Sequence, residues 1–233
     1  ETKINTFLSQ LLTEETIESS YQSSIATIWK DRVAKHQEYT AKIPFSDFKV
    51  FDFICQNLPK NSQLQVSNSS AIRYLQLFDV DKSIQVFCNR GTSGIDGSTS
   101  TAIGAASATD LPTILITGDI SFLYDSNALW NNYIPKNFKI ILLNNSGGGI
   151  FRILPGHQET ETFNTYFETS HQLNASHLAK MYGFDYFEAN NETTLQQQYS
   201  VFLDQNEKPS ILEVFTPEKE NNEILLEFFR GLK

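Results

Sequence analysis

Apolar runs alternate with helix-type patterns along most of this chain. Two of the runs, Pro112–Thr117 and Phe138–Leu143, are nearly continuous, which is typical of strands buried on both faces of a parallel sheet. The segment between them, Ser121–Asn132, has apolar residues at roughly helical spacing. A strand, a helix and a second strand with a right-handed crossover place the two strand ends side by side.

The same alternation continues on both sides of this unit. Four further strands are predicted, at Gln63–Ser67, Ser83–Cys88, Tyr186–Phe187 and Ile211–Phe215. Additional helices are predicted from Ser46 to Pro59, near His177–Tyr182, and over Thr193–Asp204 and Glu218–Arg230. We therefore expect an α/β fold, a doubly wound parallel sheet of about six strands with helices on both faces. In such folds ligands bind outside the carboxyl ends of the strands.

The chain before Ile43-Pro44 has a different character. Residues 1–12 and a long polar segment from Thr13 to about Tyr39 have apolar residues at helical spacing. We expect residues 1–43 to be the helical tail of a preceding domain with its linker, and residues 44–233 to form the main domain. Because the chain starts at Glu1 and its one methionine is Met181, we also expect a fragment or a processed product.

Composition argues against several classes of partner. A net charge of −9 disfavours nucleic acid and anionic membranes, which require basic patches. No apolar run approaches the length that spans a bilayer, and the first residues do not resemble a signal peptide. Cys55 and Cys88 lie far apart without a metal-binding spacing, which indicates free thiols in a reducing compartment. We expect a cytoplasmic protein.

Polar residues gather where the two buried strands end. Asp119 follows the first strand, Asn144-Asn145 follows the second, and three glycines, Gly147–Gly149, come next. Carboxylate, amide and main-chain carbonyl oxygens suit Mg²⁺ or Ca²⁺. The N–H groups of Ile120 and Ser121, at the start of a helix, suit phosphate. The pattern therefore predicts a site for a metal ion and a diphosphate.

Three histidines and a long loop invite other interpretations. His157, His171 and His177 match no zinc-ligand spacing, so packing or surface roles are favoured. A loop as long as Pro155–Gln172 is often a lid or a binding loop, and that role stays open.

Gly118-Asp119 followed some two dozen residues later by Asn144-Asn145 resembles the signature of thiamine-diphosphate enzymes. That family usually has a glycine directly after Gly-Asp, where this chain has Ile120. GDISFLYDSNAL, NNSGGGIFRILP and the segment Asn89–Gly97 resemble one branch of the family, the 2-succinyl-5-enolpyruvyl-6-hydroxy-3-cyclohexene-1-carboxylate synthases of menaquinone biosynthesis. The resemblance covers roughly Leu64 to the C-terminus.

This resemblance implies a transferase that uses thiamine diphosphate with Mg²⁺, or Mn²⁺ in its place. The implied reaction decarboxylates 2-oxoglutarate and adds the resulting succinyl carbanion to isochorismate in a 1,4 sense. The resemblance also implies a homodimer or homotetramer with shared active sites. The glutamate that activates the cofactor would lie on an N-terminal domain, so we expect this chain alone to be inactive.

The resemblance also assigns roles to individual residues. Arg73 and Arg90 would bind the substrate carboxylates, with Ser69 as a polar contact. Ile95 would support the bent cofactor, and the Gly94 carbonyl would meet its amino group. The implied metal ligands are Asp119, Asn145 and the Gly147 carbonyl. The implied cofactor contacts are Asn68, Ser69, Gly94, Ile95, Gly118, Asp119, Ile120, Ser121, Asn145, Gly147, Gly148 and Ile150. The implied residues on the substrate side are Ser69, Arg73, Arg90, Ile150, Phe151 and Leu154.

Two alternatives remain open. Another thiamine-diphosphate 2-oxoacid decarboxylase or synthase would share Asp119 and Asn145 but does not need Arg73 and Arg90 together. A non-catalytic nucleotide-binding domain could use the same type of sheet. The absence of G-x-G-x-x-G after any predicted strand argues against dinucleotides.

Overall fold

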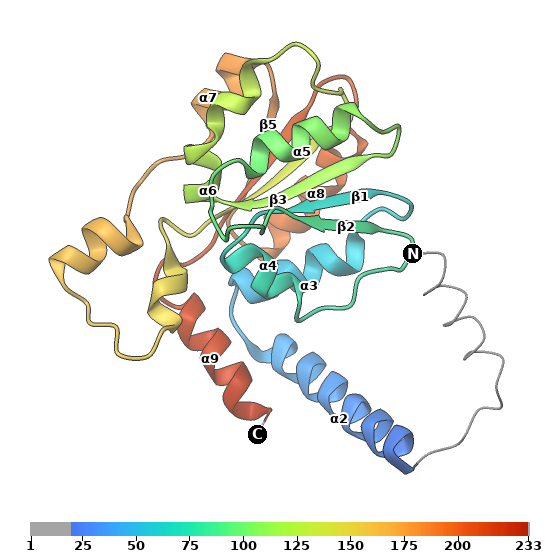
Figure 1. Ribbon diagram of the computed structural model, residues 1–233, viewed down its shortest axis with the longest axis vertical. Helices are drawn as coiled ribbons and strands as arrows, with labels where there is room; N and C mark the ends of the chain where they lie inside the picture. Colours follow the sequence, from blue (N-terminus) through green and yellow to red (C-terminus); the bar gives the residue numbers. More distant parts are fainter. Residues whose placement is uncertain (1–19, 233) are drawn as a thin grey trace.

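The computed structural model describes residues 20–232, which form a three-layer α/β arrangement with one extended helix (Figure 1). All six strands are parallel, in the sheet order β2-β1-β3-β4-β6-β5. Their bounds are β1 Gln63–Val66, β2 Gln85–Cys88, β3 Thr113–Gly118, β4 Lys139–Asn144, β5 Asp185–Ala189 and β6 Ser210–Phe215. The predicted fold class and number of strands are confirmed. The helical pattern over residues 1–12 lies outside the described residues.

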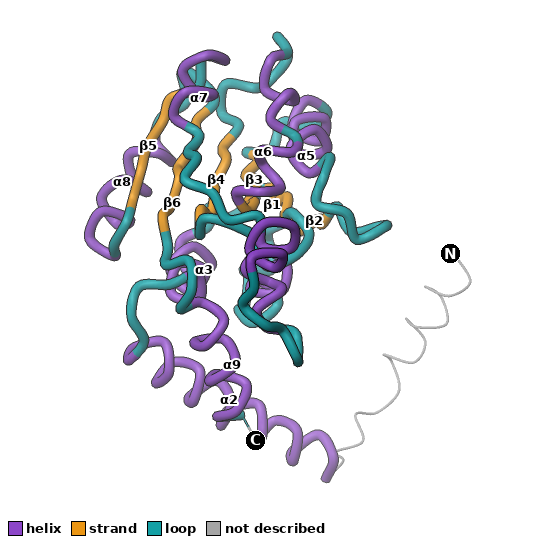
Figure 2. The backbone as a smooth tube through the Cα atoms, turned by 90° about the vertical axis from the view of Figure 1, so that its left-hand side faces the viewer, coloured by secondary structure: helices purple, strands orange, loops and turns teal. Residues whose placement is uncertain are grey.

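Helices cover both faces of this sheet, and each face has its own apolar core (Figure 2). One face packs against α3 Asp47–Asn57, α4 Ser70–Leu75, α8 Glu192–Asp204 and α9 Asn221–Gly231. The other packs against α5 Ser98–Ser107, α6 Asp119–Tyr124, η1 Ser126–Trp130 and α7 Ser176–Tyr182. Successive residues of a pleated strand point to opposite faces of the sheet. In β3, Ile114 and Ile116 pack in the core that contains α3, and Leu115 packs in the core that contains α5.

The helix predicted over Ser121–Asn132 is two shorter elements, α6 and η1, separated at Asp125. The Asp125 carboxylate accepts hydrogen bonds from the Ser100 N–H at 2.7 Å and from the Ser100 hydroxyl at 2.6 Å. Ser100 lies in the first turn of α5, where unpaired N–H groups favour an acidic partner. The break therefore coincides with a tertiary contact that stabilises the neighbouring helix.

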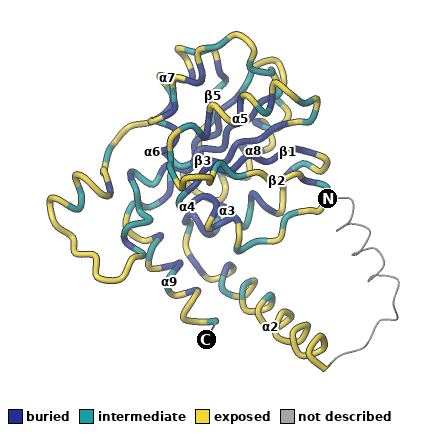
Figure 3. The backbone as a smooth tube through the Cα atoms, viewed as in Figure 1, coloured by how far each residue is buried: buried dark blue, intermediate teal, exposed yellow. Residues whose placement is uncertain are grey.

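Helix α2, Ser20–Lys42, runs away from the sheet and is mostly exposed (Figure 3). Its C-terminal end packs near α3 and α9, where Tyr39 donates a hydrogen bond to the Ile224 carbonyl at 2.5 Å. The predicted domain boundary after residue 43 stays a prediction. Within residues 20–232, no helix is long and apolar enough to cross a bilayer.

Candidate functional site

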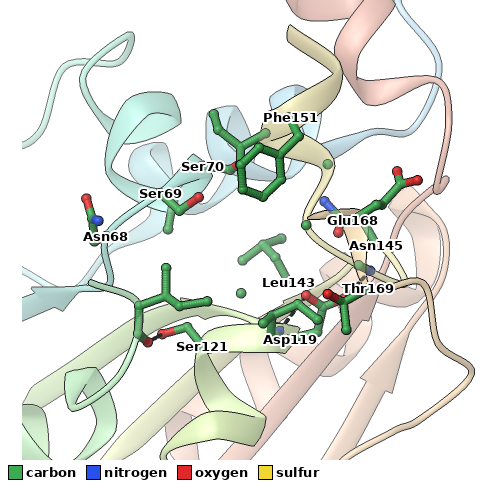
Figure 4. Close-up of a pocket in the computed structure, with 18 of the residues that line it drawn as sticks. Asn68, Ser69, Ser70, Asp119, Ser121, Leu143, Asn145, Phe151, Glu168 and Thr169 are labelled. Carbon is green, nitrogen blue, oxygen red and sulfur yellow. Dashed lines mark hydrogen bonds between the residues drawn. The ribbon is translucent and has the colours of Figure 1, made fainter. Parts of the chain in front are cut away.

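A cavity of about 370 Å³ lies at the carboxyl ends of β1, β3 and β4 (Figure 4). Its walls include the glycine turn, residues 147–149, and the segment 166–169. Most of the predicted site residues line it: Asn68, Ser69, Gly94, Ile95, Gly118, Asp119, Ile120, Ser121, Asn145, Gly147, Gly148, Ile150 and Phe151. Residues predicted from four separate segments therefore meet in one cavity.

Asp119 joins the end of β3 to the glycine turn. Its carboxylate is buried, and Oδ2 accepts a hydrogen bond from the Gly147 N–H at 2.9 Å. Oδ1 accepts from the Ile120 N–H at 2.7 Å, so this N–H, which we expected to face a phosphate, already has an acidic partner. The Ser121 hydroxyl donates to the Ile95 carbonyl at 2.5 Å and thereby fixes the main chain beside the Ile95 side chain.

The two asparagines at the end of β4, Asn144 within the strand and Asn145 directly after it, point to different places. Asn145 lines the cavity, and its amide nitrogen donates to Asp47 Oδ2 at 2.9 Å. Asn144 is buried outside this cavity, where its amide donates to Glu213 Oε1 at 2.7 Å. Of these two asparagines, only Asn145 is therefore placed to contact a molecule or ion bound in the cavity.

The donor set of the cavity fits a hard divalent cation. Asp119 supplies carboxylate oxygens, and Asn145 keeps its Oδ1 available because its nitrogen is bound to Asp47. Oxygen ligands of this kind are the ones that Mg²⁺ prefers. The Gly147 carbonyl accepts from the Gly149 N–H at 3.1 Å and, like any carbonyl, has a second lone pair. Its role as the third ligand stays a prediction.

Glycine is required at the first position of the turn. Gly147 has φ of +154°, and an added Cβ would lie 2.8 Å from the Glu168 carbonyl oxygen. That same carbonyl accepts a hydrogen bond from the Gly148 N–H at 2.6 Å. The long loop after β4 therefore packs directly on the turn and forms one wall of the cavity.

His171, in the same loop, lies beside the predicted metal ligand. Its Nε2 is 3.3 Å from Asp119 Oδ2, although it has no partner in hydrogen-bonding geometry. Its Nδ1 accepts from the Leu173 N–H at 3.1 Å, which leaves the ring proton on Nε2. The Asp119 carboxylate raises the pKa of His171 above its ordinary value. Partial burial of the ring opposes this shift and is the smaller effect.

Backbone strain is concentrated around the cavity. Among the described non-glycine residues, positive φ occurs at Ser69 (74°), Ser93 (62°), Ser146 (66°) and Thr169 (53°), with one remote case at Asn61. Such conformations cost about 1–3 kcal/mol each and persist where the surrounding structure enforces them. Ser69, with ψ of −132°, has the most unusual conformation and lies at the start of α4.

Arg73, Arg90 and Leu154 are near the cavity but do not line it. Arg73 Nη1 donates to the Ser69 carbonyl at 2.8 Å, and Arg90 Nη1 donates to Asn68 Oδ1 at 3.2 Å. Both arginines are exposed, and neither forms an ion pair with an acidic residue in the part of the chain described. Leu154 is 54% exposed. The substrate roles of these three residues stay predictions.

Sequence reasoning missed Asp47, which lines the cavity from α3. In the sequence it reads as an ordinary acidic residue in the first turn of a helix. Its carboxylate is buried and also accepts from the Thr216 hydroxyl at 2.6 Å. Burial raises the pKa of Asp47 to about 6; the hydrogen bonds from Thr216 and Asn145 oppose this shift, and the charge of Asp119 adds to it.

Comparisons with known proteins agree with this geometry. Residues 68–214 match the family described as thiamine pyrophosphate enzyme, C-terminal TPP binding domain; thiamine pyrophosphate is another name for thiamine diphosphate. A 2-succinyl-5-enolpyruvyl-6-hydroxy-3-cyclohexene-1-carboxylate synthase from Flavobacterium johnsoniae is 62% identical over 98% of this chain and 41% of its own length. Synthases of the same name from Flavobacterium psychrophilum and Bacteroides fragilis are 65% and 40% identical, over 93% and 82% of this chain.

The match covers 39% of the length of the Flavobacterium psychrophilum synthase and 35% of the length of the Bacteroides fragilis synthase. This chain therefore spans less than half the length of each of the three relatives. The family match itself covers the ends of β3 and β4, the glycine turn and the predicted metal ligands. The chain belongs to the thiamine pyrophosphate enzymes and contains their C-terminal, thiamine pyrophosphate-binding domain.

Proposed function

We propose that this chain is the C-terminal part of a 2-succinyl-5-enolpyruvyl-6-hydroxy-3-cyclohexene-1-carboxylate synthase. The whole enzyme would decarboxylate 2-oxoglutarate and add the succinyl unit to isochorismate in a 1,4 sense. Support comes from relatives of this name that match almost the entire chain. The observation that carries the proposal is one cavity that combines Asp119 and Asn145 with an apolar wall. Beside it lie two arginines that have no acidic partner among residues 20–232.

In this proposal the strand ends hold the cofactor. Asp119, Asn145 and the Gly147 carbonyl bind Mg²⁺ or Mn²⁺, whose charge offsets that of the diphosphate. Ile95, whose main chain is fixed by the hydrogen bond from Ser121, would support the cofactor, and the Gly94 carbonyl would accept a hydrogen bond from the cofactor's amino group. When bound, thiamine diphosphate supplies the nucleophilic carbon and the electron sink for decarboxylation.

The remaining residues act on substrate. Ile150 and Phe151 line the substrate side of the cavity, with Leu154 next to them, and would exclude water from it. A dry site favours loss of a carboxylate as neutral CO₂. Arg73 and Arg90 bind substrate carboxylates, because a planar guanidinium can donate two parallel hydrogen bonds to one carboxylate. Ser69 adds a polar contact at the point where the strained backbone turns into α4.

The location and assembly of the whole enzyme are also part of this proposal. Cys55 and Cys88 are both free, which fits a reducing cytoplasm. We propose a homodimer or homotetramer in which a partner subunit completes each active site. Light scattering of the full-length protein would establish its mass in solution.

Calorimetry and a substrate panel test the function. Thiamine diphosphate with Mg²⁺ is expected to bind the full-length protein, whereas NAD and ATP are not. With isochorismate present, 2-oxoglutarate is expected to react and pyruvate is not. Binding of NAD or ATP instead would favour a nucleotide-binding domain. Turnover of pyruvate without isochorismate would favour a different 2-oxoacid decarboxylase.

A further inference from the structure

Asp47 contacts three segments of the chain that are remote from it in sequence. It lies at the first position of α3, is 3% exposed and lines the cavity. Oδ2 accepts from Asn145 Nδ2 at 2.9 Å, across 98 positions of the chain, and Oδ1 accepts from the Thr216 hydroxyl at 2.6 Å. Its own N–H donates to Asn221 Oδ1 at 2.8 Å, so the helix terminus is fixed as well.

This contact determines which atom of Asn145 is available to a cation. An amide presents hydrogen-bond donors at its nitrogen and lone pairs at its oxygen. Because Asp47 accepts from the nitrogen, Oδ1 is left for the cavity. The flipped amide would place its oxygen against the Asp47 carboxylate and present N–H groups to the cation, and both contacts are repulsive. The carboxylate therefore favours one of two orientations that are otherwise similar in shape.

We infer that Asp47 is a positioning residue, whose hydrogen bond holds the Asn145 amide with its oxygen toward a divalent cation. This inference rests on the proposed function, because it presumes a cation between Asp119 and Asn145. Groups that orient metal ligands in this way contribute measurably to metal affinity. The role is distinct from that of Thr216, whose hydroxyl contacts Asp47 and not Asn145.

Asp47 could instead act through its charge alone, and an isosteric variant separates the two roles. Asp47→Asn keeps a carbonyl oxygen that can accept from Asn145 and removes the negative charge. The hydroxyl of Thr216 can then accept from the new amide nitrogen, since a hydroxyl both donates and accepts. Orientation of Asn145 is thus preserved in Asp47→Asn and lost in Asp47→Leu, which has similar size and no acceptor.

The experiment titrates Mg²⁺ into the full-length protein at saturating thiamine diphosphate, by calorimetry, and records the melting temperature without ligands. Asp47→Leu is expected to weaken Mg²⁺ binding about 10–100-fold. Asp47→Asn and the control Thr216→Val are expected to bind Mg²⁺ close to the parent level, even where their melting temperatures fall. If Asp47→Leu does not fold, Asp47→Ser, whose hydroxyl is too short to reach Asn145, carries the same expectation.

If the parent protein binds Mg²⁺ and thiamine diphosphate as expected, two results would overturn this inference and leave the proposed function standing. One is parent-like Mg²⁺ affinity in Asp47→Leu, and the other is an affinity in Asp47→Asn as weak as that in Asp47→Leu. A parent protein without any Mg²⁺-dependent binding of thiamine diphosphate would overturn the proposed function, and this inference with it.

Discussion

Arg152 and Glu168 form an ion pair in the protein interior, with side chains that are 6% and 1% exposed. Arg152 Nε and Nη2 donate to the two carboxylate oxygens of Glu168. Arg152 follows the glycine turn in η2, Gly149–Ile153, and Glu168 ends η3, Phe163–Glu168. The pair therefore fastens the long loop after β4 to the turn that lines the cavity.

Breaking the Arg152–Glu168 ion pair should lower the free energy of unfolding. In Arg152→Met the Glu168 carboxylate stays buried without a counter-charge, which typically destabilises a protein by about 3–5 kcal/mol. Urea unfolding of the parent and the variant measures this difference. The control is Lys219→Met, which removes an exposed ion pair with Glu159 and should change little. Equal losses in the two variants would show that burial of the Arg152–Glu168 pair is not decisive.

Asp119→Asn should abolish Mg²⁺-dependent binding of thiamine diphosphate. The variant keeps the shape of the side chain and removes the one anionic group among the three predicted ligands. Calorimetry with Mg²⁺ and thiamine diphosphate measures the effect. Asp125→Asn is the matched control, since Asp125 contacts α5 and does not line the cavity. A parent-like dissociation constant for Asp119→Asn would place the metal elsewhere.

Arg90→Met should impair the use of substrate without weakening cofactor binding. Loss of a charge-assisted hydrogen bond costs about 1.5–3 kcal/mol, or roughly tenfold to a hundredfold in kcat/KM. Steady-state kinetics of the full-length enzyme with 2-oxoglutarate and isochorismate, with calorimetry for the cofactor, would separate the two effects. Arg230→Met, at an exposed position in α9, should leave kcat/KM unchanged. Unchanged kinetics in Arg90→Met for both substrates would exclude the assigned role.

Lys139 should make stability depend on pH. It is the first residue of β4, only 3% exposed, and burial lowers its pKa from 10.5 to about 8. Between these values the unfolded chain binds more protons than the folded chain, so this contribution to stability rises with pH and is lost as pH falls through 8. The unfolding free energy of the parent should therefore increase relative to Lys139→Met, by up to about 1.4 kcal/mol per pH unit.

Urea unfolding of both proteins at several pH values between 7 and 9.5, roughly the window in which the lysine loses its proton, tests this expectation. Contacts that the two proteins share cancel in the comparison. A difference that stays constant across the range would mean that Lys139 titrates normally in the folded protein.

The sheet and the edge at which the cavity lies were predictable because apolar runs and the residues that end them are local signals. Helix α5 had no counterpart among the predicted helices, since its sequence of small residues lacks a clear apolar stripe. The break at Asp125 coincides with a contact to Ser100, 25 positions away, which no local pattern reveals.

The cavity itself was predicted only in part, for a similar reason. Asp119 and Asn145 were found because each directly follows a buried strand. The link from Asp47 to Asn145 spans 98 positions and exists only in the folded chain. The positive φ of Ser69 was not predictable either, because glycine is the residue that normally adopts this conformation.

Three carboxylates line the cavity within residues 20–232, and each already has partners. Asp119 accepts from the Ile120 and Gly147 N–H groups, and Asp47 accepts from Thr216 and Asn145. Glu168 is paired with Arg152. Each is therefore already bonded to other groups of the protein, and Asp119 is in addition the proposed metal ligand.

We therefore expect that this chain alone does not release CO₂ from 2-oxoglutarate. The family resemblance requires a glutamate that hydrogen-bonds N1′ of the cofactor pyrimidine, and all three cavity carboxylates are committed to other groups. A new bond to the pyrimidine would compete with these existing partners, and displacing them costs free energy in a buried site. The measurement supplies the chain with thiamine diphosphate, Mg²⁺ and 2-oxoglutarate and compares CO₂ release with a cofactor-only blank. The full-length enzyme is the positive control, and turnover by the chain above the blank would mean that one of its own residues activates the cofactor.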